Sequence, residues 1–331
     1  PQLIAGPIVH HKEMMPQFAS VKNKVINYKN IALGLFIFSI GLFKKVVIAD
    51  TFAIWATAGF DTAITLNLFE AWATSISYTF QLYFDFSGYT DMAIGAALLF
   101  NIKLPINFNS PLKATGIIDF WQRWHITLSS FITAYIYTPL VKSFNNLSFH
   151  KAMIATFITF LIAGLWHGAS WMFVIFGGLH GIALVVNNYW KRSKLKINKI
   201  LAWFITFNFV NIAFIFFRAK EWNDAIKVLD SMFSLDNVVL PGLLRGKIGF
   251  LNQFNIDFGG FTDNLTTQVH EGEILLLAIC VSLLFILIFK NSMEILKDFK
   301  ASNYLLISTV MYFIISILKF NEYSEFLYFR F

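Results

Sequence analysis

The sequence predicts an all-α fold, that of a polytopic transmembrane protein with further re-entrant and interfacial helices. Of the 331 residues, 57% are hydrophobic and only 14% are charged, whereas soluble domains carry about 25% charged and roughly 45–50% apolar residues. Residues 152–190 contain no Asp, Glu, Lys or Arg, and this stretch is about twice the roughly 20 residues that one helix needs to cross a bilayer. The chain therefore has too few polar residues to cover a water-facing surface.

Charge-free apolar stretches predict the membrane-spanning helices. Residues 152–190 are long enough for two spans, which we expect to be joined near Gly168 to Ser170. One further span each is predicted for residues 200–217, 274–289 and 301–318. Shorter or more polar stretches are expected to cross, to re-enter or to lie on the interface, namely residues 30–43, 71–84, 92–102 and 124–141. Broken helices among them must be packed inside protein or line a wet cavity, because lipid offers no hydrogen bonds to the backbone.

The charged loops predict the orientation. Residues 191–199 carry five Lys or Arg and no acid, which places this loop in the cytoplasm by the positive-inside bias. Residues 218–272 then form an extramembrane loop on the opposite side. Apolar residues recur there at helical spacing and predict an amphipathic surface helix, namely Trp222, Ala225, Ile226, Leu229 and Phe233. We expect residues 1–331 to form a single integral membrane domain that further helices precede, since the sequence begins at Pro1 with no leader.

Composition and motifs exclude several classes of function. The net charge of +7 indicates loop charge and membrane lipids as partners, not nucleic acid. The single cysteine, Cys280, permits neither an intrachain disulfide nor a cysteine metal site, and we predict no metal. The absence of GxGxxG, P-loop, HExxH and GxSxG motifs removes the usual support for nucleotide-driven transport, zinc proteolysis and serine hydrolysis.

Three histidines, His125, His167 and His180, stand in apolar surroundings. Ionisable groups are costly at membrane depth, so each indicates a functional site, although a neutral imidazole can also simply join two helices. Around His167, Gly164 and Gly168 permit close helix approach, and the bulky Trp166 and Trp171 suit the walls of a tunnel. On one unbroken helix His167 and His180 would lie about 220° apart, so both can face one site only if the helix breaks between them.

Two polar clusters leave alternatives open. Arg123, Trp124 and His125 follow Asp119, a combination that suits an anionic or thioester ligand but is also typical of an interfacial segment. Composition favours the interface. Asp85 and Asp91 are compatible with a cation site in a transporter, or with caps of a helix that begins near Asp91.

Several motifs resemble the membrane-bound O-acyltransferase (MBOAT) family, and specifically its bacterial branch that O-acetylates alginate and other cell-envelope polysaccharides. The matching motifs follow one another along most of the chain. They begin at Pro1 (PQLIAGPIV), Lys44 (KKVVIAD), Gln81 (QLYFDFSGYTDMAIG), Leu104 (LPINFNSP), Phe120 (FWQRWHITLS), Gly164 (GLWHGASW), Phe216 (FFRA) and Phe326 (FLYFRF).

This resemblance implies an inner-membrane enzyme that takes an acyl group from a cytoplasmic thioester, and acetyl is the acyl group that we expect. The donor is acetyl-coenzyme A or an acyl-carrier protein, and no cofactor is bound permanently. The acceptor is a hydroxyl of alginate, peptidoglycan, cellulose or a teichoic acid, reached directly or through an extracytoplasmic acetyltransferase partner. The family's principal histidine falls on His167 and its second histidine on His125. The resemblance also implies further helices before Pro1.

In this interpretation His167 is the general base, and His125 orients the donor or polarises its carbonyl. Candidate donor-binding residues are Arg123, Trp124, Asn107 and Asn109, although the Asn-Ser-Pro sequence of this last segment is also typical of a turn.

The segment after His125, residues 131–142, lacks the Arg-Asp-Tyr element and the basic loop usual in relatives. This difference affects the identity of the acceptor, or of a partner that docks there, more than it affects the reaction. Two alternatives to an enzyme stay open. One is a transporter of an envelope precursor in which Asp85, Asp91 and the buried histidines relay protons. The other is a catalytically inactive scaffold of an acetylation complex.

Overall fold

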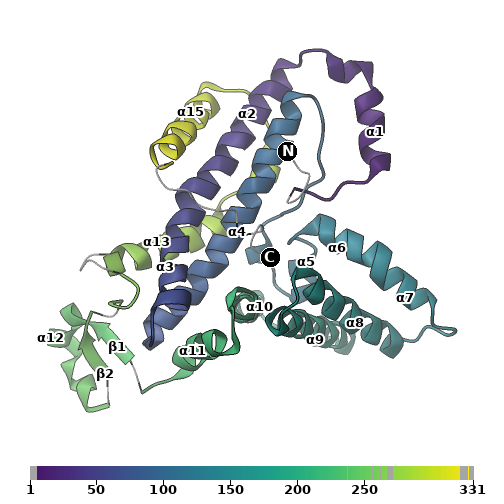
Figure 1. Cartoon of the computed structure of the whole chain (residues 1–331). Helices are drawn as coiled ribbons and strands as arrows, with labels where there is room; N and C mark the ends of the chain where they lie inside the picture. The colour runs from purple at the N-terminus through teal and green to yellow at the C-terminus, as the bar shows by residue number, and fades with distance from the viewer. Residues whose placement is uncertain are drawn as a thin grey trace.

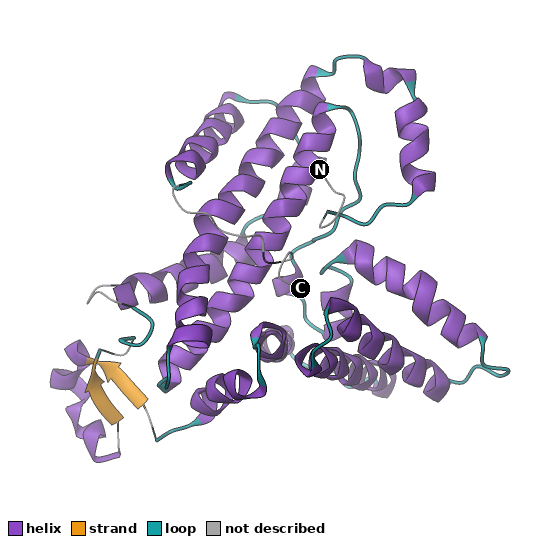
Figure 2. Ribbon diagram, in the orientation of Figure 1, coloured by secondary structure: helices purple, strands orange, loops and turns teal. Residues whose placement is uncertain are grey.

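The computed structural model describes residues 6–236, 238–254, 256–260, 262–266, 271–320 and 327. Helices dominate this part of the chain (Figures 1 and 2), as the sequence predicted. The motif residues at Pro1–Ala5 and most of the closing motif lie outside the described residues.

The first long helical segment consists of four elements that follow one another without a break. They are α2 (Tyr28–Phe43), η2 (Lys44–Ala49), α3 (Asp50–Thr57) and η3 (Ala58–Thr62), of which η2 and η3 are π-helical. This segment lies along α4 (Leu68–Leu99) (Figure 1). A Cβ atom on Gly34 would lie 2.7 Å from the carbonyl oxygen of Gly95, and one on Gly41 would lie 2.5 Å from that of Gly88. The close approach therefore depends on glycine.

The continuity of α4 corrects one prediction. Residues 71–84 and 92–102 were expected as separate segments, and one of the two interpretations of Asp91 made it a cap of the second. Instead α4 begins at a capping box formed by Asn67 and Glu70 and runs unbroken through Asp91. Gly88 lies within this helix, where its lack of a side chain permits the contact with Gly41 of α2.

A second group of helices follows α4 in the chain. It comprises η4 (Pro111–Lys113), α5 (Ile117–Trp121), α6 (Ile126–Ile132), η5 (Thr133–Tyr137) and α7 (Thr138–Lys142), then α8 (Phe149–His167), α9 (Trp171–Ser193) and α10 (Lys199–Arg218). The predicted break between two spans near Gly168 is confirmed, because α8 ends at His167 and α9 starts at Trp171. Gly168 has a φ of +159°, next to the phenyl ring of Phe173.

A helix, α11 (Trp222–Phe233), lies at the position where the sequence predicted an amphipathic one. Its inward face carries Ala225, Val228 and Met232, whereas Trp222 and Phe233 are exposed. Beyond it β1 (Val238–Pro241) pairs in parallel with β2 (Ile256–Gly259), a small sheet that the sequence analysis did not predict (Figure 2). The remaining elements are α1 (His11–Ala19), η1 (Val21–Lys24), η6 (Gly242–Leu244), α12 (Arg245–Ile248), η7 (Gly249–Phe254), α13 (Glu271–Ile288), α14 (Ser292–Lys297) and α15 (Asn303–Leu318).

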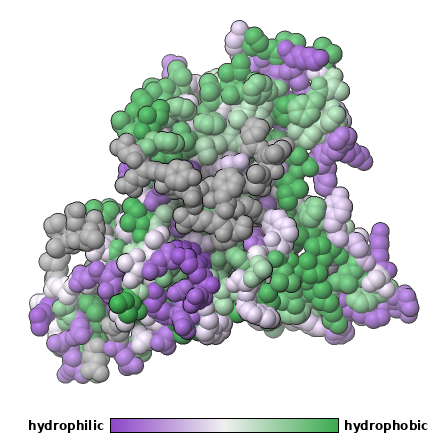
Figure 3. All heavy atoms as spheres, in the orientation of Figure 1, coloured by the Kyte–Doolittle hydropathy of each residue, from purple (hydrophilic) through white to green (hydrophobic). Residues whose placement is uncertain are grey.

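Five helical segments within the described residues are long and apolar enough to cross a membrane. They are Tyr28–Thr62, Phe149–His167, Trp171–Ser193, Lys199–Arg218 and Gly272–Lys297. The predicted span at residues 301–318 corresponds to the shorter apolar helix α15. Apolar side chains cover α15 and the α8–α9 pair, and polar ones gather around β1 and β2 (Figure 3). The chain is a multi-pass membrane protein.

Candidate active site

His125 and His167 line the same small cavity, although 42 positions of sequence separate them. The cavity volume is about 20 Å³, which is roughly the space that one water molecule needs. The rest of its lining is apolar or aromatic and comes from α4, α5, α6, α9, α10 and the turn before α6, namely Leu82, Phe86, Trp121, Trp124, Leu128, Phe176, Phe214 and Phe217. Two imidazoles thus border one narrow space that admits a group the size of a hydroxyl.

His167 is the last residue of α8, and Gly168 ends the helix immediately after it. The imidazole is half-buried among aromatic rings, with centroid distances of 5.0 Å to Phe217, 6.2 Å to Phe176 and 6.1 Å to Phe173. These rings belong to α9 and α10, so three helices fix the position of this histidine.

His125 lies at the N-cap of α6 in a left-handed backbone conformation, with a φ of 44°. Non-glycine residues adopt this conformation only where their surroundings enforce it. Here the segment around Asn107 does so, because the Ile126 amide donates to the Asn107 carbonyl (3.0 Å) and the Asn109 amide donates to the Arg123 carbonyl (2.9 Å). The His125 ring, 3% exposed, meets the ring of Phe86 edge-on at 4.7 Å.

The side chain of Asn107 determines which nitrogen of His125 carries the proton. Asn107 is fully buried, and its Oδ1 accepts from the Thr127 amide (3.2 Å) and from Thr127 Oγ1 (2.9 Å). Because a backbone amide can only donate, this atom of Asn107 must be the carboxamide oxygen. His125 Nδ1, 3.1 Å from the same oxygen, must therefore be the donor. In the neutral ring this leaves Nε2 as a hydrogen-bond acceptor.

His180 has a different environment and does not line the cavity. Its ring is fully buried, and Nδ1 accepts a hydrogen bond of 3.1 Å from Trp121 Nε1. The bond joins α5 to α9, which is the alternative that the sequence analysis gave for an intramembrane histidine. The break at Gly168 therefore does not bring His180 to the site.

The four predicted donor-binding residues occupy different places. Trp124 lines the cavity, and Asn107 lies behind His125. Arg123 pairs with Asp119 at 2.7 Å, with about a third of each side chain exposed. Asn109 Oδ1 accepts from the carboxamide of Asn291 at 3.0 Å. The structure therefore brings Trp124 and Asn107 to the histidines, but not Arg123 and Asn109.

The expectation for the neighbouring tryptophans is corrected. Trp166 is 53% exposed and Trp171 is 78% exposed, and neither lines the cavity. The indole walls come from Trp121 and Trp124 instead, since α8 and α9 turn the first pair outward. Gly164 packs against Gly177 of α9, not in a pair with Gly168, which lies beyond the helix.

The carboxylates of α4 form ion pairs that the sequence analysis missed. Lys44 Nζ lies 2.7 Å from Asp91, and Lys45 Nζ lies 2.9 Å from Asp85 and 2.7 Å from Asp50. The adjacent lysines of the KKVVIAD motif were the available signal, because buried acids require cations. Because both carboxylates have lysine partners, they no longer indicate a cation site. Among the described residues, no cluster of three or more His, Cys, Asp or Glu suited to a metal occurs.

Comparison with known proteins decides the family. The family model described as MBOAT, membrane-bound O-acyltransferase family, matches residues 1–220, about two thirds of the chain. The chain belongs to the membrane-bound O-acyltransferase family. Within this family, the chain is 51% identical over 338 aligned positions to the peptidoglycan O-acetyltransferase of Helicobacter pylori, covering 100% of this chain and 62% of that protein.

Two further relatives extend the comparison within the MBOAT family. The probable alginate O-acetylase AlgI of Pseudomonas aeruginosa is 36% identical, over 75% of this chain and 47% of the relative. The teichoic acid D-alanyltransferase of Streptococcus thermophilus is 29% identical, over 66% of this chain and 59% of the relative. The chain thus spans between about half and three fifths of the length of these relatives.

Proposed function

We propose that this protein transfers an acetyl group from a thioester donor to a hydroxyl of a cell-envelope polysaccharide in the bacterial inner membrane. The observation that carries the proposal is the meeting of His125 and His167 on one small, largely apolar cavity. The relatives support it, because their names describe acyl transfer to peptidoglycan, alginate and teichoic acid. All three acceptors are envelope polymers, and the two more similar relatives transfer acetyl.

In the proposed mechanism His167 is the general base. It takes the proton of the acceptor hydroxyl as the oxygen attacks the thioester carbonyl carbon. The new C–O bond forms, the C–S bond breaks, and the imidazolium returns the proton to the leaving thiolate. General-base assistance contributes typically about 10²–10⁴-fold to the rate, and the aromatic rings around His167 keep competing water away from the thioester.

We assign His125 to orientation and not to polarisation of the carbonyl. An oxyanion requires hydrogen-bond donors, whereas Asn107 holds the proton of neutral His125 on Nδ1. Nε2 is then an acceptor, suited to the acceptor hydroxyl or to an amide N–H of the donor. Asn107 is accordingly a positioning residue.

The donor and the route of transfer are further parts of the proposal. Acetyl-coenzyme A or an acyl-carrier protein would present the thioester from the cytoplasm, with Trp124 of the cavity lining in contact with it. A hydroxyl-bearing intermediate carrier, or an extracytoplasmic acetyltransferase, would complete transfer to the polymer. The segment after His125, residues 131–142, comprises the end of α6 with η5 and α7, and we propose it as the place where that partner docks.

The test is single-turnover transfer of radiolabelled acetyl from acetyl-coenzyme A in membranes that carry the full-length protein. We compare wild type with His167→Ala, and use His11→Ala, an exposed histidine in α1, as the matched control. The expected result is a loss of at least about 100-fold for His167→Ala and wild-type transfer for His11→Ala. If His167→Ala keeps within about tenfold of wild-type turnover, the assignment of the base is wrong.

A second arm separates the donors and the competing functions. If the wild-type protein leaves acetyl-coenzyme A intact, a labelled acyl-carrier protein replaces it in the same assay. Transfer from neither donor, with a partner protein still bound, would identify the inactive scaffold. The alternative of a proton-relay transporter is less well supported, because Asp85 and Asp91 are paired with Lys45 and Lys44.

A further inference from the structure

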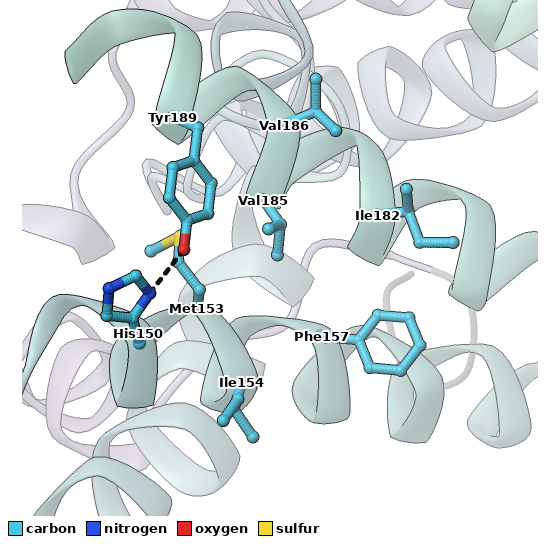
Figure 4. Close-up of a pocket in the computed structure, with 8 residues that line it drawn as sticks. All are labelled: His150, Met153, Ile154, Phe157, Ile182, Val185, Val186 and Tyr189. Atoms are coloured by element: carbon cyan, nitrogen blue, oxygen red, sulfur yellow. Dashed lines mark hydrogen bonds between the residues drawn. The ribbon is translucent and has the colours of Figure 1, made fainter. Parts of the chain in front are cut away.

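The pair of helices α8 and α9 opens into a groove at the end opposite to His167. The groove has a volume of about 410 Å³, within the range of roughly 300–1,000 Å³ that is usual for small-molecule sites. Side chains of both helices project into it (Figure 4), namely His150, Met153, Ile154 and Phe157 of α8 and Ile182, Val185, Val186 and Tyr189 of α9. Most of this surface is apolar, and only His150 and Tyr189 bring polar atoms to it.

Glycines hold the two helices close near His167, whereas larger side chains line the groove. Near His167, Cβ atoms on Gly164 and Gly177 would lie 2.3 and 2.4 Å from carbonyl oxygens of the facing helix, so the backbones touch. One turn further along α9, a Cβ atom on Gly181 would lie 2.9 Å from the ring of Phe157. Beyond that point larger side chains follow at helical spacing, such as Val185 and Tyr189, and line the groove.

The far end of the groove is polar and carries a cation. His150 Nδ1 and Tyr189 Oη lie 2.6 Å apart and bridge the two helices there (Figure 4). The ring of Tyr189 packs edge-on against the ring of Phe149, with 4.9 Å between the centroids. The guanidinium of Arg192 lies 4.7 Å from the centroid of the Phe149 ring. This cation–π contact holds Arg192 beside the mouth of the groove.

The charges around this end have a single sign. No Asp or Glu occurs in residues 120–220. The N-terminal turn of α8 and the end of α9 with the loop after it carry Lys151, Lys191, Arg192, Lys194, Lys196 and Lys199. Within the described parts of the chain, none of these six cations forms an ion pair with a carboxylate. This surface is therefore suited to bind an anion.

We propose that the groove binds one anionic phospholipid. An acyl chain would lie along Val185, Ile182 and Phe157, and the phosphate would lie at the polar end, against Arg192 and the His150–Tyr189 pair. Basic pockets between membrane helices bind acidic headgroups in this way. Ordinary lipid contact would require only an apolar surface, whereas this groove joins an apolar hollow to fixed cations. The proposal is independent of acyl transfer.

The test is native mass spectrometry of the purified full-length protein with phosphatidylglycerol and, separately, with phosphatidylcholine of the same acyl chains. The wild-type protein is expected to retain one phosphatidylglycerol in preference to phosphatidylcholine. Arg192→Gln should weaken retention of phosphatidylglycerol about fivefold, the contribution of one interfacial cation. Val185→Phe, which fills the groove, should weaken retention of both lipids. Lys22→Gln, the same charge change at an exposed position of η1, should change neither.

A labelling experiment tests the proposal without any variant. Phosphatidylglycerol with a photoreactive diazirine on one acyl chain should label residues 150–157 and 182–189 of the wild-type protein. Equal retention of the two lipids, wild-type retention by Arg192→Gln, or labels spread over the other helices would each overturn the proposal.

Discussion

Replacing Asn107 by leucine removes the atom that holds the turn of His125 in place. Oδ1 of Asn107 accepts three hydrogen bonds, from the Thr127 amide (3.2 Å), Thr127 Oγ1 (2.9 Å) and His125 Nδ1 (3.1 Å), and all three residues are buried. The Thr127 hydroxyl also accepts from the Ile8 amide (3.1 Å) and can turn to another acceptor. The Thr127 amide and the His125 N–H cannot do so, and leucine leaves both unsatisfied.

The expected cost follows from these two donors. Each buried unsatisfied group costs about 1–3 kcal/mol, so Asn107→Leu should lower the free energy of unfolding by about 2–6 kcal/mol. In metal sites, the groups that orient a ligating histidine change affinity or activity by about 10–100-fold when they are lost, and we take the same range for the orientation of His125. We expect acetyl transfer to fall by that factor at a temperature where the variant remains folded. Thermal unfolding in detergent and single-turnover transfer measure the two effects.

Asn107→Asp is the conservative control for Asn107→Leu. A carboxylate oxygen still accepts from the Thr127 amide and from His125 Nδ1, so the tautomer with Nε2 as an acceptor is kept. Nitrogen-15 NMR of labelled histidine distinguishes this tautomer directly. Nδ1 should be protonated in wild type and in Asn107→Asp, and should lose this preference in Asn107→Leu. Wild-type transfer by a folded Asn107→Leu protein would refute the positioning role.

Three further variants test other parts of the structure. A Cβ atom on Gly177 would lie 2.4 Å from the carbonyl oxygen of Phe160, so Gly177→Leu should separate α8 from α9 and abolish acetyl transfer. A wild-type melting temperature of this variant would contradict the packing. Lys45→Met removes the cation that pairs with Asp85 and should lower the free energy of unfolding by about 3–5 kcal/mol. The double variant that adds Asp85→Asn should recover this stability, and thermal unfolding measures both. His180→Gln should keep acetyl transfer within about tenfold in folded protein, because this ring lies outside the cavity; a loss like that of His167→Ala would show otherwise.

The sequence predicted those features that depend on local signals. The break after His167 follows from Gly168, and α11 follows from the spacing of its apolar residues. The two histidines of the cavity were candidates because few ionisable residues stand in apolar stretches. The motifs then ranked them above His180.

The features that sequence reasoning missed depend on partners far along the chain. Asn107 looked like part of a turn, because nothing nearby in sequence shows that His125 and Thr127 will donate to it. Asp91 was interpreted as part of a cation site or as a helix cap, because its partner Lys44 lies in another segment. A buried polar residue can be satisfied locally or at long range, and a single sequence distinguishes these cases poorly.

The bond from the Leu327 amide to Asp85, 3.0 Å long, spans 242 positions of sequence. Asp85 lies between Leu82 and Phe86, two α4 residues that line the cavity. During synthesis Lys45 can reach Asp85 as soon as α4 is made, but Leu327 emerges only after every other described helix. The carboxylate beside the cavity wall can therefore receive this hydrogen bond only after residue 327 has been synthesised. A ribosome-bound chain that stops at residue 320 would contain both histidines of the cavity and still lack this bond.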